Sequence, residues 1–194
     1  MLYLLILILI LLLVWKETSD ENPQPLPAHI PTTSNPISPD MNEIVNKVKE
    51  KYNDIALKYD AVSFPANQYV SYKDILAIIC KESGNHILAG LNSQYITGDN
   101  GNSIGIMQVQ EGALEDVNNS LGTNYVFTDL RDDDINVLVG SHYLELCFEW
   151  AFKRHPKDVR ALAVRRYNGG NVVSETNSIS MQYYQDFLTF RSLL

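Results

Sequence analysis

The stretch "ILAIICKES", residues 75–83, places an ionisable side chain, Glu82, at the end of a strongly apolar run. The isoleucines that share a helical face with Glu82 are Ile75, Ile78 and Ile79. An apolar helical face is normally turned toward the core, so the carboxyl group of Glu82 is expected to be buried with it. Burial disfavours the charged form of a carboxyl group and raises its pKa, which suits a general acid. The alternative is that Glu82 lies in solvent because the helix frays before Gly84.

Helical patterns continue on both sides of this stretch. Ser71 and Asp74 have the spacing of a capping box, which predicts that the helix carrying Glu82 starts there. Apolar periodicity predicts further helices over residues 41–59, 111–121, 132–152, 156–170 and 180–194. The segment 132–152 is apolar nearly all round, which predicts a central buried helix with an acidic run at its N-terminus. Residues 84–105 are rich in Gly, Asn and Ser and predict loops with a small hairpin. The fold class is therefore mainly α with a small loop/β-hairpin region.

The sequence before residue 40 differs in composition from the rest. Residues 1–15 are entirely apolar, and as a helix they would be about 22 Å long, which is short for a bilayer core of about 30 Å. Trp15 and Lys16 suit a membrane interface, and no small-residue cleavage site follows, so a membrane anchor is favoured over a signal peptide. Residues 16–39 hold six of the eight prolines and predict an extended linker to a globular domain over residues 40–194.

Composition and charge exclude several classes of partner. The formal net charge of −8 disfavours nucleic-acid binding, which needs clustered Lys and Arg. The four histidines are scattered without a metal-ligand pattern, and the sequence has no phosphate-binding glycine loop, so we expect no metal and no cofactor. Cys80 and Cys147 both fall in apolar helical segments, where the sequence is equally compatible with a disulfide and with two core thiols.

The stretch "SIGIMQV", residues 103–109, places small residues before an apolar–polar pair, Met107 and Gln108. Gly105 allows a backbone to approach a ligand closely. The amide of Gln108 offers a donor and an acceptor, which suit an amide or a sugar hydroxyl. A loop that enters a helix with a buried methionine is the alternative interpretation of the same residues.

The stretch "RRYNGG", residues 165–170, has the composition of a helix end. Tyr167 and Asn168 close the helical pattern, and Gly169 takes the C-terminal cap position. An ordinary helix stop and a tyrosine–asparagine pair that faces a site are equally compatible with this stretch alone.

Taken in order, "ES" at Glu82, "GIMQ" at residues 105–108 and "YNGG" at residues 167–170 resemble the three motifs of the lytic transglycosylases of the soluble-lytic-transglycosylase type. These cell-wall enzymes have a lysozyme-like fold related to goose-type lysozyme. The resemblance extends over residues 72–188. Ile106 stands where the family commonly has Leu, and Arg166 stands where it commonly has Ala. Neither departure replaces a group that is expected to do chemistry.

This resemblance implies a reaction, a substrate and a set of site residues. Glu82 would act as catalytic acid and then base on the β-1,4 bond between N-acetylmuramic acid and N-acetylglucosamine in peptidoglycan, leaving a 1,6-anhydro end. Tyr167 would orient Glu82 by a hydrogen bond. The residues implied in substrate binding are Ser83, Met107, Gln108, Tyr167, Asn168 and Tyr184. The chain would be membrane-anchored through its N-terminal helix, with the domain facing peptidoglycan in a bacterial envelope or from a phage virion membrane.

Three other functions are weighed against this one. A hydrolytic lysozyme on the same fold needs a second carboxylate, for which Asp99 is the best candidate, although Asp99 also suits a turn. "GNSIG", residues 101–105, matches the nucleophile elbow of serine hydrolases at Ser103, but the residues before it are too polar for a buried strand. A non-catalytic glycan-binding module on a membrane stalk is the third, and it predicts that Glu82→Gln retains biological activity.

Overall fold

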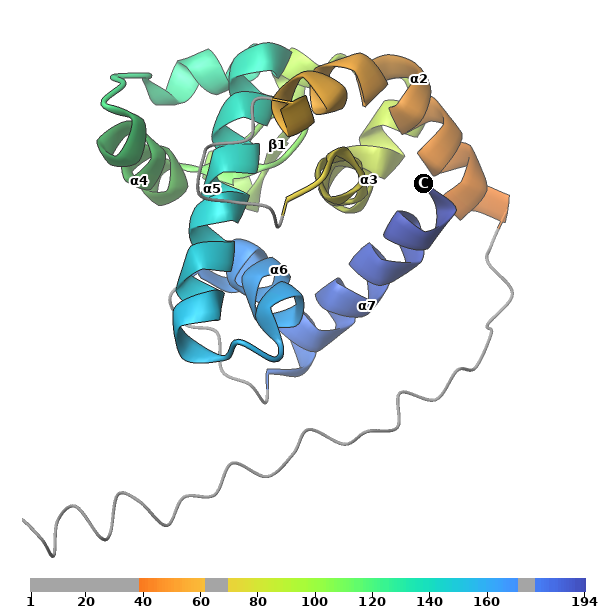
Figure 1. Cartoon of the computed structure of the whole chain (residues 1–194). Coiled ribbons are helices and arrows are strands. Elements are labelled where there is room, and N and C mark those ends of the chain that lie inside the picture. The colour runs from red at the N-terminus through yellow and green to blue at the C-terminus, as the bar shows by residue number, and fades with distance from the viewer. Residues whose placement is uncertain (1–38, 62–69, 171–176) are drawn as a thin grey trace, which may run out of the picture. The chain divides into compact units, whose positions relative to one another are not determined.

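Helices make up most of the chain that the computed structural model describes, namely residues 39–61, 70–170 and 177–194 (Figure 1). The α-helices in these ranges are α2 (Pro39–Ala61), α3 (Tyr72–Leu88), α4 (Glu111–Leu121), α5 (Asp133–Arg154), α6 (Val159–Gly169) and α7 (Ser178–Leu193). The 3₁₀ helices are η1 (Ser93–Tyr95), η2 (Asp99–Gly101) and η3 (Phe127–Arg131). The mainly α class that the sequence predicts is confirmed.

The predicted anchor, residues 1–15, and nearly all of the predicted linker, residues 16–39, lie outside the described ranges. Among the helices that are described, none has both the length and the apolar character needed to cross a bilayer. The linker prediction meets the structure only at Pro39, where α2 begins. Proline is well suited to a first helical turn, because the backbone N–H that it lacks would have no partner within the helix there.

Helix α3 lies in the middle of the domain, with α2 and α7 packed along it (Figure 1). Its residues from Asp74 to Cys80 are all buried. The predicted capping box is confirmed, because the backbone N–H of Ser71 donates to the carboxylate of Asp74 at 2.9 Å. Asp74 also forms ion pairs with Arg160 of α6 and Arg191 of α7. The start of α3 is thereby tied to two other helices.

Helix α3 continues through Gly84 to Leu88, so the alternative in which it frays before Gly84 is wrong. The reason is packing against α2. A Cβ atom at Gly84 would lie 2.4 Å from Cγ2 of Ile44, which is closer than two non-bonded carbon atoms can approach. The glycine therefore permits a close helix–helix contact, and α3 extends more than one turn beyond Glu82.

Gly84→Ala is expected to lower the free energy of unfolding by about 1–2 kcal/mol. Overpacking against Ile44 outweighs the gain in helix propensity, which is about 1 kcal/mol. Urea unfolding measures the change. The matched control is Gly112→Ala in α4, where nothing lies within 4 Å of the added methyl group and stability should stay the same or rise. Equal unfolding midpoints for the two variants would contradict the packing role of Gly84.

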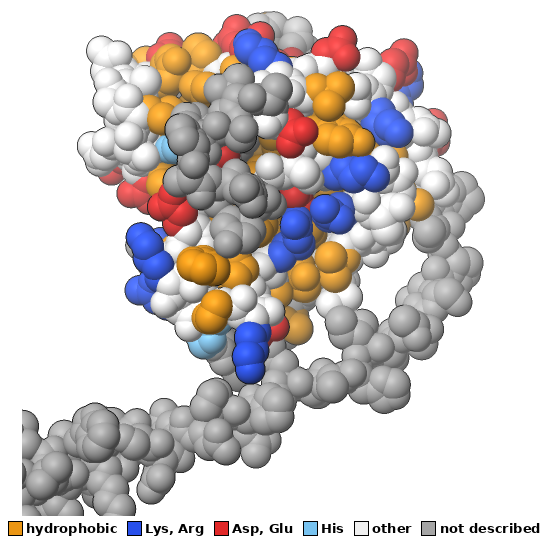
Figure 2. Space-filling view, viewed as in Figure 1, with side chains coloured by type: hydrophobic (Ala, Val, Ile, Leu, Met, Phe, Trp, Pro, Cys, Tyr) orange, Lys and Arg blue, Asp and Glu red, His pale blue; other side chains and the backbone are white. Residues whose placement is uncertain are grey.

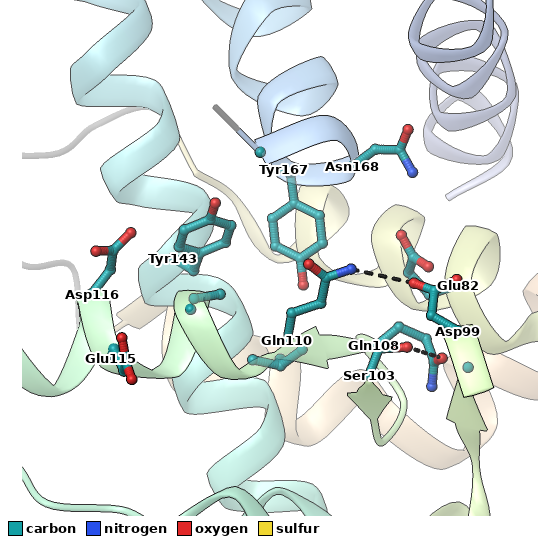
Figure 3. Close-up of a pocket in the computed structure, with 15 residues that line it drawn as sticks. Glu82, Asp99, Ser103, Gln108, Gln110, Glu115, Asp116, Tyr143, Tyr167 and Asn168 are labelled. Carbon is teal, nitrogen blue, oxygen red and sulfur yellow. Dashed lines mark hydrogen bonds between the residues drawn. The ribbon is translucent and has the colours of Figure 1, made fainter. Parts of the chain in front are cut away.

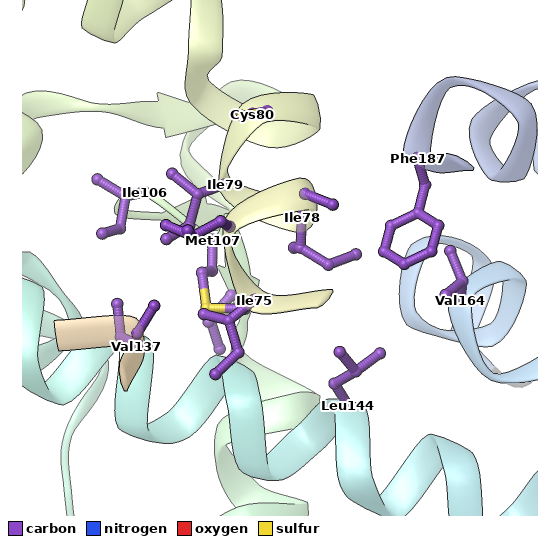
Figure 4. Close-up of a cluster of buried hydrophobic side chains, with 14 of the residues drawn as sticks. Ile75, Ile78, Ile79, Cys80, Ile106, Met107, Val137, Leu144, Val164 and Phe187 are labelled. Atoms are coloured by element: carbon purple, nitrogen blue, oxygen red, sulfur yellow. The ribbon is translucent and has the colours of Figure 1, made fainter. Parts of the chain in front are cut away.

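Helix α5 is buried along most of its length, as its all-round apolar pattern predicts: no position from 135 to 150 is exposed. Figure 4 shows side chains of α3, α5, α6 and α7 converging on one apolar cluster. Labelled members of this cluster are Ile75, Ile78, Ile79, Cys80, Ile106, Met107, Val137, Leu144, Val164 and Phe187. The acidic run caps α5 as expected, because Asp132 accepts a hydrogen bond from the backbone N–H of Ile135 at 3.1 Å.

The two cysteines are free and buried, so the core-thiol alternative is the one that the structure supports. Burial raises the pKa of the Cys80 and Cys147 thiols to about 12. Both thiols are therefore protonated near neutral pH, and they pack as small apolar side chains.

A small antiparallel sheet stands where the sequence predicts a hairpin. Its strands are β1 (Thr97–Gly98), β2 (Ser103–Ile104) and β3 (Val109–Gln110), in the order β1-β2-β3. Gly98 lies opposite Ser103, and Ile104 lies opposite Val109. The third strand forms because residues 105–108, the "GIMQ" stretch, reverse the chain between β2 and β3.

On the face of the domain in Figure 2, acidic and basic side chains of the described residues are interspersed.

Candidate active site

A cleft of about 460 Å³ lies beside α3, between the small sheet, α4 and the end of α6 (Figure 3). Each of the three motif stretches contributes to its lining: Glu82 from the first, Gln108 from the second, and Tyr167 and Asn168 from the third. Residues far apart in the sequence therefore meet in one cleft.

Glu82 is partly buried at the wall of this cleft. Burial away from water raises the pKa of its carboxyl group to about 7. A hydrogen bond from Tyr183 and the positive charge of Lys81 act in the opposite direction, and the negative charge of Asp99 adds to the increase. A carboxyl group with this pKa is present in both protonation states near neutral pH, so it can donate a proton and later accept one.

Tyr183 of α7 holds Glu82 in place, which differs from the implied role of Tyr167. The hydroxyl of Tyr183 donates to Oε1 of Glu82 at 2.5 Å. The hydroxyl of Tyr167 donates instead to the backbone carbonyl of Met107 at 2.8 Å, so it ties the end of α6 to the "GIMQ" turn. The implied hydrogen bond from Tyr167 to Glu82 is thus replaced by one from the last helix.

Tyr184 is not among the described residues that line the cleft, contrary to its implied role. It packs against Phe187, with ring centroids 6.2 Å apart. One residue turns an α-helix by about 100°, so Tyr183 and Tyr184 cannot face the same way. Helical spacing from Phe187 and Phe190 back to Tyr183 is the sequence signal that could have identified the inward tyrosine.

Ser83 and Met107 lie beneath the cleft rather than on its surface. Ser83 is 1% exposed and its hydroxyl donates to the carbonyl of Gly105, while Met107 is fully buried. Met107 packs against α5 at Gly140, where a Cβ atom would come within 2.6 Å of the methionine sulfur. These two implied substrate-binding residues therefore support the turn and contact no open space, which agrees with the buried-methionine alternative.

The turn between β2 and β3 is held by Asn136 of α5, which sequence reasoning did not single out. Its Oδ1 accepts from the backbone N–H of Met107 at 2.9 Å, and its Nδ2 donates to the carbonyls of Ile104 and Leu130, each at 2.9 Å. Gly105 has φ +80°, and a Cβ atom there would lie 2.1 Å from Nδ2 of Asn136. The close approach expected at Gly105 is thus made to Asn136 and not to a ligand.

Gln108 projects from this turn into the cleft, with a backbone φ of 49° that is uncommon for a residue other than glycine. Its side-chain oxygen accepts from the hydroxyl of Ser103 at 2.8 Å (Figure 3). Its Nε2 donates to the carbonyl of Gly105 at 2.7 Å. Ser103 is buried and serves to fix the Gln108 amide. A pre-oriented amide of this kind is suited to a hydroxyl or N-acetyl group of a sugar.

The opposite wall of the cleft is formed by α4 and α5 (Figure 3). Glu115 and Asp116 lie on α4, and Tyr143 of α5 contacts Tyr167, with ring centroids 5.6 Å apart. No Lys or Arg is found among the described residues that line the cleft. Sequence reasoning missed this wall, because exposed acids on a helix carry no pattern that separates them from an ordinary solvated face.

No protein-family model, no curated protein and no solved structure matches this chain. The chemistry of the site is therefore judged from its geometry. It offers one carboxyl group poised for proton transfer, fixed amides, tyrosine side chains and an open cleft.

Asp99 lies on the same side as Glu82, and its Oδ2 accepts from Nε2 of Gln110 at 3.2 Å (Figure 3). A polymer with many hydroxyl and amide groups is the class of ligand that these features suit.

Proposed function

We propose that the domain is a lysozyme-like peptidoglycan lytic transglycosylase, with Glu82 as its catalytic acid and base. The observation that carries the proposal is the position of Glu82. A carboxyl group with a pKa of about 7 lies in a cleft to which the "GIMQ" and "YNGG" stretches also contribute. The motif resemblance predicts this grouping from order in the sequence, and burial supplies the raised pKa independently.

The proposed reaction uses Glu82 twice. Protonated Glu82 gives its proton to the glycosidic oxygen as the bond from that oxygen to the anomeric carbon of N-acetylmuramic acid breaks. The carboxylate then takes the proton of the C6 hydroxyl of the same sugar, whose oxygen bonds to the anomeric carbon. The products are a free hydroxyl on N-acetylglucosamine and a 1,6-anhydro ring, and Glu82 is protonated again. The substrate's own N-acetyl group stabilises the cationic centre, so a second carboxylate is not required.

The proposal includes the location of the enzyme. Residues 1–15 would anchor the chain in a membrane, and residues 16–39 would let the domain reach peptidoglycan from a bacterial envelope or from a phage virion membrane. We propose no cofactor and no nucleic-acid partner. A tether of this kind would limit where a wall-cutting activity acts.

Hydrolysis is the second candidate, because Asp99 lines the same cleft as Glu82 and its charge acts on the Glu82 carboxyl group. The products separate the two reactions. Mass spectrometry of muropeptides released by the purified chain should find 1,6-anhydro ends if the proposal holds. Reducing ends on the released sugars would overturn it in favour of a lysozyme.

The pH dependence of cleavage offers a directional prediction. The acid must be protonated, so the rate should fall as the pH rises through about 7. Tyr183→Phe removes a hydrogen bond that lowers the pKa of Glu82, so this limb should move to higher pH. Asp99→Asn removes a charge that raises the pKa, so the limb should move to lower pH. The measurement is kcat/KM against pH for the three chains.

The maximal rate of Asp99→Asn also distinguishes the two reactions. A transglycosylase should keep the maximal rate of Asp99→Asn within about tenfold of the unmodified chain, because Asp99 acts only through its charge. A loss of about a hundredfold or more in the maximal rate of Asp99→Asn would identify Asp99 as a base for water.

A further inference from the structure

A second cavity of about 380 Å³ adjoins the cleft, because the two share part of their lining. Its lining residues are Asp99, Asn102, Gln110, Glu111, Gly112 and Phe127. Three of these, Asp99, Gln110 and Gly112, also line the cleft. The two cavities therefore border one another along β3 and the start of α4.

Gly112 lies where the two cavities meet. A Cβ atom at this position would have nothing within 4 Å, so the space beside Gly112 is open. Gln110 is exposed and lies two residues before Gly112. Its Nε2 donates a hydrogen bond to Oδ2 of Asp99. Gln110 lines both cavities, and its side-chain oxygen is an acceptor for a sugar hydroxyl or an N-acetyl N–H.

Phe127 gives the second cavity an aromatic surface on a rigid support. Its ring is partly buried against the core and partly open to the cavity. The helix η3 that carries it is fixed on both sides: the backbone N–H of Val126 donates to Asp129 at 2.9 Å, and Arg131 donates to the carbonyl of Gln94. Nδ2 of Asn118 donates to the carbonyl of Tyr125 at 2.8 Å, which fixes the chain just before η3. An ordered aromatic face beside amide groups binds the apolar face of a sugar ring.

From this arrangement we propose that the second cavity is a distal sugar subsite, in which Phe127 packs against a pyranose ring and the amides of Asn102 and Gln110 bind its polar substituents. The inference rests on the proposed glycan-cleaving function and extends it. The chain recognises a longer run of β-1,4-linked N-acetylated sugars than the units next to Glu82. Affinity therefore depends on the length of the glycan, and Phe127 is the source of that dependence.

The test uses the full-length chain with Glu82→Gln, so that ligands are not cut, and β-1,4 oligomers of N-acetylglucosamine as probes. Isothermal titration calorimetry compares the trimer with the hexamer. We expect the hexamer to bind about tenfold more tightly, and Phe127→Ala to remove most of this difference. Asn102→Ala, a change at an exposed position, should also reduce the difference in affinity between hexamer and trimer. It takes the place of Phe127→Ala in the comparison if that variant does not fold. The control is Val126→Ala, an exposed neighbour that does not line the cavity, which should keep the full difference.

Each result has a defined meaning. If the trimer binds and the hexamer binds no more tightly, the distal subsite is overturned while the proposed function stands. The same holds if Phe127→Ala and Asn102→Ala both retain the full hexamer advantage. If neither oligomer binds, glycan recognition by this cleft is itself overturned, and the subsite falls with it.

Discussion

Glu82→Gln is expected to lower the rate of peptidoglycan cleavage about a thousandfold or more while the domain stays folded. Glutamine has nearly the same shape, but its amide can neither give nor take the proton that the reaction transfers. The hydrogen bond from Tyr183 can still be accepted by the amide oxygen, so the position of the side chain should be preserved. The measurement is the release of muropeptides from purified peptidoglycan.

The same variant should be at least as stable as the unmodified chain at pH 8. The pKa of Glu82 is raised to about 7 in the folded chain from an ordinary 4.5, so the unfolded chain ionises this group at lower pH than the folded chain does. Stability of the unmodified chain therefore decreases as the pH rises between these values, and glutamine removes that loss. Thermal unfolding at pH 8 separates lost chemistry from lost structure.

Glu50→Gln is the matched control for this experiment. Glu50 is exposed on α2 and pairs only with Lys47 among the described residues, at 2.9 Å, and surface pairs of this kind contribute little to stability. This variant should cleave at the unmodified rate. Full activity in Glu82→Gln would remove the proposed mechanism and favour a glycan-binding module that does not cut.

Asn136→Ala is expected to lower the free energy of unfolding by about 3 kcal/mol or more. The change leaves one buried N–H and two buried carbonyl groups without their partner, and each such group costs about 1–3 kcal/mol. It also leaves a cavity in the core. Urea unfolding measures the loss of stability. The rate of peptidoglycan cleavage should also fall under conditions where the variant is still folded, because the turn that carries Gln108 is no longer held.

Asn85→Ala is the control, since Asn85 is an exposed asparagine on α3 and its loss should change stability by less than about 0.5 kcal/mol. Asn136→Asp provides a second comparison. Aspartate keeps the acceptor for the N–H of Met107 but places its other oxygen against two carbonyl groups. An unchanged unfolding midpoint in Asn136→Ala would show that the turn is held by something other than this side chain.

The sequence by itself determined which segments are helical and that Glu82 shares a helical face with three isoleucines. Spacing alone predicted α3 and its capping box, because helical periodicity is a local property that neighbouring residues encode. It left open whether Glu82 lies against the core or in solvent. It also predicted the buried character of α5, since an all-round apolar helix has no stable place at the surface. What spacing does not contain is the identity of the residue on the other side of a contact.

Only the tertiary structure decided those partners. It assigned the hydrogen bond on Glu82 to Tyr183 and not to Tyr167, it placed Asn136 under the "GIMQ" turn, and it showed that Gly84 serves the contact with Ile44 and does not end a helix. Each of these depends on how two helices, or a helix and a turn, lie across one another. The pKa of Glu82 belongs to the same group, because the water it loses is displaced by residues that are distant in sequence.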